Sequence, residues 1–158
     1  MSIVIVFLMC TIQANAQKNV PNITVKNLDG STLNMDKITK SKGVKILNFW
    51  ATWCVPCINE LDAISEVYED WVDETGVELI AIATDDARTK KRIKPLVNGK
   101  DWEYKILLDE NQDLQRALNI TTIPHVVVIK NGRIVFRHTG YFPGAEDQLY
   151  DVVKKNAK

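Results

Sequence analysis

The sequence has few cysteines, no long apolar run and no surplus of charge of either sign. Its 158 residues contain three cysteines, and 20 basic residues balance 20 acidic ones. A zero net charge gives no electrostatic signal for nucleic acid or an anionic membrane surface, so we expect no nucleic-acid partner. Internal repeats and low-complexity segments are also missing. With 46% hydrophobic residues, the composition is that of one soluble domain with a proper core.

The apolar stretch at the N-terminus runs only from Ile3 to Ile12. It is shorter than the roughly 20 residues that span a bilayer, and Ala14-Asn15-Ala16 after it has the small-residue pattern of a signal-peptidase site. We predict a secretory signal over 1–16 and one domain over 17–158. The predicted location is the periplasm, and a form tethered by an uncut signal stays open. No Lys or Arg precedes the stretch, which departs from the usual signal pattern.

Cys10 raises the alternative of a lipoprotein. The preceding Phe7-Leu8-Met9 lacks the small residues of lipidation sites, which argues against it. Without 1–16 the chain keeps only Cys54 and Cys57, an even count that suits a single pair in an oxidising compartment.

Cys54 and Cys57 are separated by two residues, a spacing found in half zinc sites, structural disulfides and redox dithiols. The apolar run 44–50 before them predicts a strand covered on both faces. Pro56 suits a first helical turn, so a helix is expected to begin at Cys57 with Cys54 at its N-terminus. Apolar residues at helical spacing continue this helix: Leu61, Ile64, Val67, Tyr68, Trp71 and Val72.

A helix N-terminus stabilises a thiolate, which is the reactive form of cysteine. Cys57 lies one turn later on the same face, close enough to form a short disulfide with Cys54. We therefore expect Cys54 to be the exposed nucleophile. Cys57 is expected to be the buried resolving thiol, because it heads the apolar stripe through Leu61 and Ile64.

The run Phe49-Trp50-Ala51-Thr52-Trp53-Cys54-Val55-Pro56-Cys57 resembles the thioredoxin superfamily, and within it the extracytoplasmic TlpA/ResA-like thiol-disulfide oxidoreductases. The resemblance covers most of the chain after about Val20. It implies a thioredoxin-like three-layer α/β fold with a mixed central β-sheet, helices on both faces, an N-terminal β-hairpin extension and a central helix-strand insertion. It implies no metal and no organic cofactor.

The other elements follow from periodicity and turn signals. Asp29-Gly30 and Asn131-Gly132 each predict a hairpin, Asp85 or Asp86 is expected to cap a helix, and Gly76 to end one. The remaining predicted strands span 23–26, 31–34, 77–83, 102–108, 125–129 and 133–136. The remaining predicted helices span 35–38, 88–97, 113–118 and 143–156.

Pro124 stands directly before a predicted strand, where proline is tolerated because the first residue need not donate a ladder bond. The resemblance implies a cis-proline here, packed beside the two cysteines. The backbone of Ile123 would then be free to pair with an extended substrate segment. Trp53 is either a core residue or, as the resemblance implies, a partly exposed platform near the reactive sulfur.

Glu60 follows Cys57 by three residues. It is either an ordinary solvent-facing helix acid or a partly buried carboxylate with a raised pKa that carries the proton of Cys57. The resemblance favours the second, since TlpA/ResA-like proteins have Glu at the matching position. Asn48 stands where thioredoxin has a buried Asp, and its plain interpretation is a polar strand residue with local hydrogen bonds. We hypothesise that Glu60 replaces that missing Asp.

We interpret both histidines as structural residues. His125 follows Pro124 and could join Cys54 and Cys57 around a metal, but three ligands without a fourth candidate argue against it. His138 is expected on a strand that faces neither the cysteines nor the proline.

Thiol-disulfide exchange on extracytoplasmic proteins is the function that the resemblance implies. Cys54 would attack an oxidised protein substrate such as apocytochrome c, and Cys57 would release it. A membrane thiol-transfer protein would re-reduce the pair, and we expect a monomer.

Three rival functions remain. A DsbA-like oxidase would use the same residues in reverse, although its large helical insertion is missing here, and Val55-Pro56 alone does not fix the direction. A peroxidase would need the Pro-x-x-x-Thr-x-x-Cys pattern, which is absent. A copper-binding chaperone or non-catalytic binding module is the rival from another class, but copper-delivery relatives carry Cys-x-x-x-Cys.

Overall fold

The central strand β3 (Val44–Trp50) is buried along its whole length. It pairs in parallel with β4 (Glu78–Ala83) and antiparallel with β6 (His125–Lys130). An apolar strand with neighbours on both edges and helices on both faces has no exposed side, which is why the run lacks the alternation of a surface strand. This computed structural model describes residues 19–158, so the predicted signal over 1–16 and Cys10 lie outside the described residues.

Seven strands form one mixed sheet in the order β2-β1-β5-β4-β3-β6-β7. The strand β5 (Lys105–Leu108) lies parallel to β4, and β1 (Thr24–Asn27) with β2 (Thr32–Asn34) forms the predicted N-terminal hairpin on its far edge. At the opposite edge β7 (Arg133–Thr139) follows β6 through a tight turn. Asn131 and Gly132 in this turn have φ of 49° and 82°, the left-handed backbone that a two-residue hairpin turn requires.

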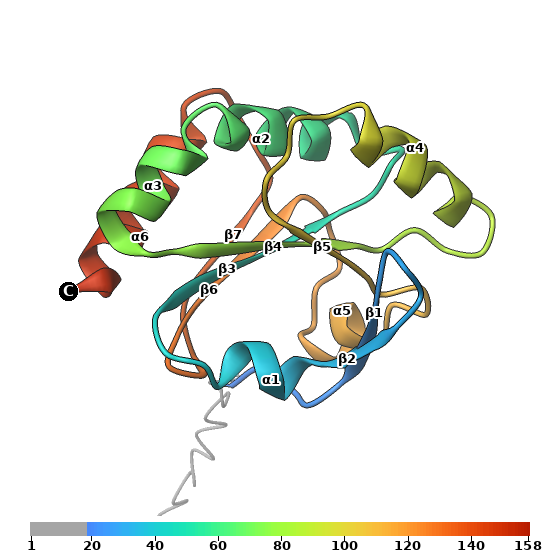
Figure 1. Cartoon of the computed structure of the whole chain (residues 1–158), viewed down its shortest axis with the longest axis horizontal. Helices are drawn as coiled ribbons and strands as arrows, with labels where there is room; N and C mark the ends of the chain where they lie inside the picture. Colours follow the sequence, from blue (N-terminus) through green and yellow to red (C-terminus); the bar gives the residue numbers. More distant parts are fainter. Residues whose placement is uncertain (1–18) are drawn as a thin grey trace, which may run out of the picture.

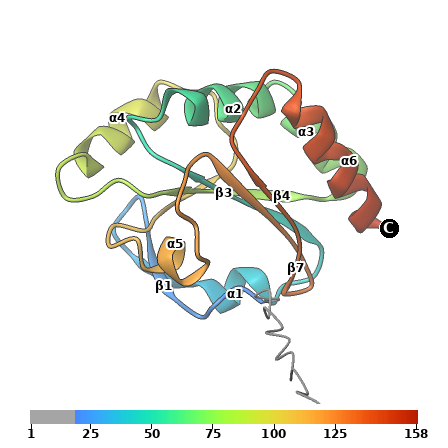
Figure 2. The ribbon, with the colours of Figure 1, turned by 180° about the vertical axis from the view of Figure 1, so that it is seen from behind.

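Helices cover both faces of the sheet, which gives three layers (Figures 1 and 2). One face carries α2 (Val55–Ser65), α3 (Tyr68–Thr75), α4 (Ile93–Asn98) and α6 (Ala145–Ala157). The other carries α1 (Met35–Thr39) and α5 (Asp113–Ala117). The buried side chains accordingly divide into two clusters, and both cysteines belong to the cluster under α2. The expected thioredoxin-like fold is confirmed.

Several predicted elements differ in their bounds. The helix after the cysteines stops at Ser65, whose hydroxyl donates to the Asp62 carbonyl, a side-chain bond that bends or ends helices. The chain resumes as α3, so one expected helix is two. The helix expected over 88–97 begins as the 3₁₀ turn η1 (Lys90–Arg92) and continues as α4. The strand expected from Trp102 begins only at Lys105.

No helix between residues 19 and 158 has the length and apolar character needed to cross a membrane.

Candidate active site

The two cysteines form a disulfide at the start of α2. Cys54 is the N-cap residue, Val55 opens the helix, and the Cys54 and Cys57 Cα atoms are 5.3 Å apart. The Cys54 N–H donates to the Ala51 carbonyl at 3.0 Å, which closes the turn between β3 and α2. Pro56 occupies the first turn, where its missing N–H costs no helix bond. The predicted pairing and helix N-terminus are confirmed.

The expectation that Cys54 is exposed is wrong for this oxidised state. Its side chain is only 6% exposed, and that of Cys57 is fully buried. The bond to the buried Cys57 sulfur holds Cys54 against the core, while its neighbours Trp53 and Val55 are 57% and 65% exposed. Trp53 thus has the exposed position that the resemblance implied. Of the two sulfur-bearing side chains, Cys54 is still the one nearer to solvent.

The strand β6 brings Pro124 to the end of β3 from which the cysteine turn emerges. Phe49 of β3 pairs with His125, and the Ile123–Pro124 peptide bond directly before it is cis, as expected. Gly140, after β7, donates its N–H to the Pro124 carbonyl at 2.8 Å. Within residues 19–158 no backbone hydrogen bond involves Ile123. Its N–H and carbonyl therefore have no backbone partner among these residues.

Glu60, one helical turn after Cys57 on α2, forms a buried pair with Asn48 of β3. The Asn48 Nδ2 donates to Glu60 Oε2 at 2.7 Å, and the two side chains are 0% and 3% exposed. Burial raises the pKa of Glu60 to about 7, which the Asn48 hydrogen bond opposes and the charge of Glu146 reinforces. Glu60 is thus a buried acid whose proton is exchangeable near neutral pH, rather than a solvent-facing helix acid.

Asp85 fixes the cysteine turn, a role that sequence analysis missed. Its carboxylate accepts from the Thr52 N–H at 2.9 Å and from the Thr52 hydroxyl at 2.5 Å, and it is fully buried at the end of β4. We expected Asp85 or Asp86 to cap a helix. That expectation is wrong, because Thr89 is the N-cap of η1 and Asp86 only accepts from the Arg88 N–H. The sequence signal for this role was the position of Asp85 just after β4. Because β4 lies parallel to β3, the carboxyl ends of both strands meet at the same edge of the sheet.

The residues just before β5 contact α2 through side-chain hydrogen bonds and an ion pair. The Tyr104 hydroxyl donates to the Leu61 carbonyl at 2.5 Å, and Trp102 Nε1 donates to Asp62 at 2.9 Å. Lys100 adds an ion pair with Asp62 at 2.6 Å. The central insertion therefore fixes the helix that carries Cys57 and Glu60.

His125 is buried and hydrogen-bonded. Its Nδ1 lies 2.8 Å from the Thr139 hydroxyl. Burial, together with the charges of Arg137 and His138, lowers its pKa to about 4, so the imidazole is neutral at pH 7. Nowhere between residues 19 and 158 do three His, Cys, Asp or Glu side chains converge as a metal site requires.

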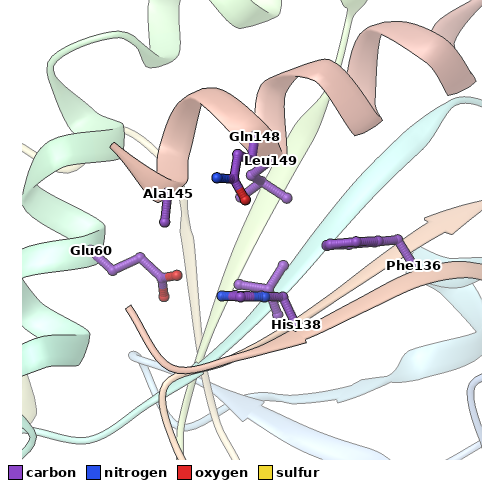
Figure 3. Close-up of a pocket in the computed structure, with 7 residues that line it drawn as sticks. Glu60, Phe136, His138, Ala145, Gln148 and Leu149 are labelled. Atoms are coloured by element: carbon purple, nitrogen blue, oxygen red, sulfur yellow. The ribbon is translucent and has the colours of Figure 1, made fainter. Parts of the chain in front are cut away.

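His138 was expected to face neither the cysteines nor the proline, and none of these residues lines the cavity that it faces, but its place beside Glu60 was not predicted. Its side chain and that of Glu60 line one cavity between α2, α6 and the β6–β7 hairpin (Figure 3). The cause is a bulge: Val128 pairs with Phe136 but Ile129 pairs with Ile134, which leaves Val135 unpaired. One extra residue reverses the face on which later side chains lie, so Phe136 and His138 lie over the cluster under α2.

The fold and the paired cysteines define a thiol-disulfide oxidoreductase of the thioredoxin superfamily, which is a redox enzyme. The model of the AhpC/TSA family matches residues 16–137. ResA from Bacillus thuringiensis subsp. konkukian, a thiol-disulfide oxidoreductase, is 32% identical over 139 residues, covering 87% of this chain and 76% of the relative. ResA from Bacillus anthracis is 33% identical with the same coverage. The chain therefore belongs to the AhpC/TSA family and to its TlpA/ResA-like members.

Solved structures agree with this assignment. An uncharacterized thioredoxin-like protein from Porphyromonas gingivalis superposes with a TM-score of 0.77 at 44% identity, covering 87% of this chain and 91% of that one. StoA from Bacillus subtilis superposes with a TM-score of 0.64 at 20% identity, covering 84% and 97%. At that identity the second likeness shows the fold alone.

Proposed function

We propose that this protein reduces disulfides of proteins outside the cytoplasm, with Cys54 as nucleophile and Cys57 as resolving thiol. The observation that carries the proposal is the Cys54–Cys57 pair at the N-terminus of α2, one helical turn before the buried Glu60. A helix N-terminus favours the Cys54 thiolate. Cys57, at the buried position, attacks only after the first sulfur has reacted.

The reaction proceeds in two exchanges. The Cys54 thiolate attacks one sulfur of the substrate disulfide, and the other substrate sulfur leaves as a thiolate with the electron pair of the broken bond. Cys57 then loses its proton and attacks the Cys54 sulfur, which releases the second substrate thiolate and closes the Cys54–Cys57 disulfide. Two electrons pass from the protein to the substrate, which ends as a dithiol.

Glu60 serves this second exchange as the acceptor of the Cys57 proton. Its pKa of about 7 is close to working pH, where a group accepts and returns protons with the least cost. Asn48 holds the carboxylate in place through its Nδ2. We therefore expect Glu60→Gln to change the pH profile of thiol exchange, and an unchanged profile would remove Glu60 from the mechanism.

Substrate recognition is assigned to the surface around Cys54. The open backbone groups of Ile123, beside the cis-Pro124, pair with an extended substrate segment independently of its side chains. Trp53 adds an exposed apolar platform next to the disulfide. Oxidised apocytochrome c is the substrate we infer from the ResA-like membership, with a membrane thiol-transfer protein as electron donor and the periplasm as location. The protein acts as a monomer after cleavage of residues 1–16.

Trapping the mixed disulfide tests the roles of the two cysteines. Cys57→Ser should accumulate a covalent adduct on Cys54 when it meets a peptide with an oxidised Cys-x-x-Cys-His sequence, the haem-attachment pattern of c-type cytochromes. Cys54→Ser is the matched control and should form no adduct. The reverse result would exchange the two roles, and no adduct with either variant would remove the reductase proposal. A peptide with the same composition but with the His displaced tests the substrate class by mass spectrometry.

A further inference from the structure

The cavity beside Glu60 is separate from the surface where substrate meets Cys54. Its walls come from α2, α6, β6 and β7, and it encloses about 20 Å³, which is room for one water molecule. Figure 3 shows Glu60 and His138 both directed into it, from α2 and β7. The lining residues are Glu60, Val126, Phe136, His138, Ala145, Gln148 and Leu149.

Glu60 has no direct route to solvent for a proton. Its side chain is 3% exposed, and the single hydrogen bond it makes within the described chain is with Asn48, which is itself fully buried. His138, by contrast, is half-buried on the edge strand β7, and Gln148 beside it is exposed on α6. The cavity therefore joins a buried acid to the surface on the β7 and α6 side.

Other titratable groups surround Glu60 from every packed element. They are Cys57 on α2, Tyr104 before β5, Tyr141 after β7, Glu146 on α6 and His138 on β7. Burial raises the pKa of both tyrosines, so they keep their protons at neutral pH. Glu146 accepts from the Gly144 N–H. Of these groups, His138 is the one that lines the cavity together with Glu60, which singles it out.

The histidine also has charged neighbours of its own. On β6, the pKa of His125 is lowered in part by the charges of His138 and Arg137, which places these groups within electrostatic reach of one another. Phe136 stacks on His138 at 6.4 Å between ring centroids. No described residue makes a hydrogen bond to the His138 ring, so both ring nitrogens are available to water or to the carboxyl.

We propose that His138 is the positioning residue through which Glu60 exchanges its proton with solvent. This inference rests on the proposed function, in which Glu60 receives the Cys57 proton. The carboxyl then passes that proton, directly or through one cavity water, to the His138 imidazole, which releases a proton to bulk water. The electron pair of the S–H bond stays on Cys57 and forms the new disulfide bond. Nothing but the substrate disulfide is reduced.

The test separates the two exchanges in time. Reduced protein is mixed rapidly with a model aromatic disulfide in weak buffer: attack by Cys54 gives the first phase and resolution by Cys57 the second. For His138→Gln we expect an unchanged first phase and a second phase about tenfold slower near pH 7, with an altered pH profile. For His138→Ala, added imidazole should restore the second phase to within about twofold of wild type.

Leu149→Met is the matched control, since it changes the wall of the same cavity and alters no titratable group, and it should keep the wild-type pH profile. A second phase of wild-type rate and pH profile in His138→Gln would overturn the relay. Equal slowing of both phases without rescue by imidazole would also overturn it, because it would show a structural role. If the wild-type protein gave no exchange at all, the proposed function would fall, a different outcome from either of these.

Discussion

Asn48 on the central strand donates a hydrogen bond to Glu60 on α2, and the two atoms Nδ2 and Oε2 are 2.7 Å apart in a fully buried setting. The bond stabilises the ionised carboxylate, whereas burial favours the neutral acid. The single side-chain oxygen of Asn48, Oδ1, is buried and has no partner among residues 19–158. A 180° turn of the amide would let it accept from protonated Glu60, so Asn48 can bond to either form.

Asn48→Leu should raise the pKa of Glu60 above about 7, because it removes the one hydrogen bond that lowers this pKa. We expect a rise of about one unit, the equivalent of one hydrogen bond to a charged group. A carbon-detected NMR titration of the Glu60 carboxyl measures it. The exposed Asn22→Leu should leave the titration unchanged. A lowered or constant pKa in Asn48→Leu would contradict the assigned direction.

Glu60→Gln should flatten the pH dependence of stability between pH 4.5 and about 7. The native pKa is about 7 against an ordinary 4.5, so the native state holds a proton that the unfolded chain has lost in this window. Glu60 therefore contributes stability that is full below 4.5 and is lost as pH rises through about 7. The loss is about 3 kcal/mol at 1.36 kcal/mol per unit. Urea unfolding across this range measures it, and the exposed Glu69→Gln should keep the wild-type slope.

The ionisation of His125 should affect the pH dependence of stability in the opposite direction, so that stability falls as the pH falls. Its native pKa of about 4 lies below the ordinary 6.5, so its contribution to stability is present above 6.5 and is lost as pH falls toward 4. His125→Gln keeps an amide group near Thr139. Its free energy of unfolding should therefore fall less between pH 7 and acidic pH than that of the wild type. If this variant loses as much stability on acidification as the wild type, the imidazole is not the group responsible.

Asp85→Ala should destabilise the protein by about 1–3 kcal/mol, because it leaves the Thr52 N–H without its buried acceptor. Asp85→Asn should cost less, since its oxygen can still accept from that N–H while its amide faces the Thr52 hydroxyl. Asp86→Ala removes an exposed ion pair with Arg88, which water screens, and should change stability much less than Asp85→Ala. Urea unfolding ranks the three variants, and an equal loss of stability for Asp85→Ala and Asp86→Ala would contradict the role of Asp85 in fixing the cysteine turn.

Sequence patterns were sufficient wherever the relevant physics is local. The apolar run of β3, the Asn131-Gly132 turn and the Cys54–Cys57 spacing each determine their own geometry within a few residues. The role of Asp85 and the cavity that His138 shares with Glu60 were not predicted, because the partners lie far apart in sequence. Thr52 is 33 positions from Asp85, and the direction of His138 depends on a bulge that alternation alone does not reveal.

The reduction potential of the Cys54–Cys57 pair tests the central claim most directly. Residues 17–158 would be equilibrated against glutathione or dithiothreitol buffers, and the fraction oxidised measured by thiol alkylation. The account predicts a value near that of thioredoxin, about −270 mV, as a protein kept reduced by an electron donor requires. A value near about −120 mV would make the protein an oxidant of thiols and would contradict the reductase function.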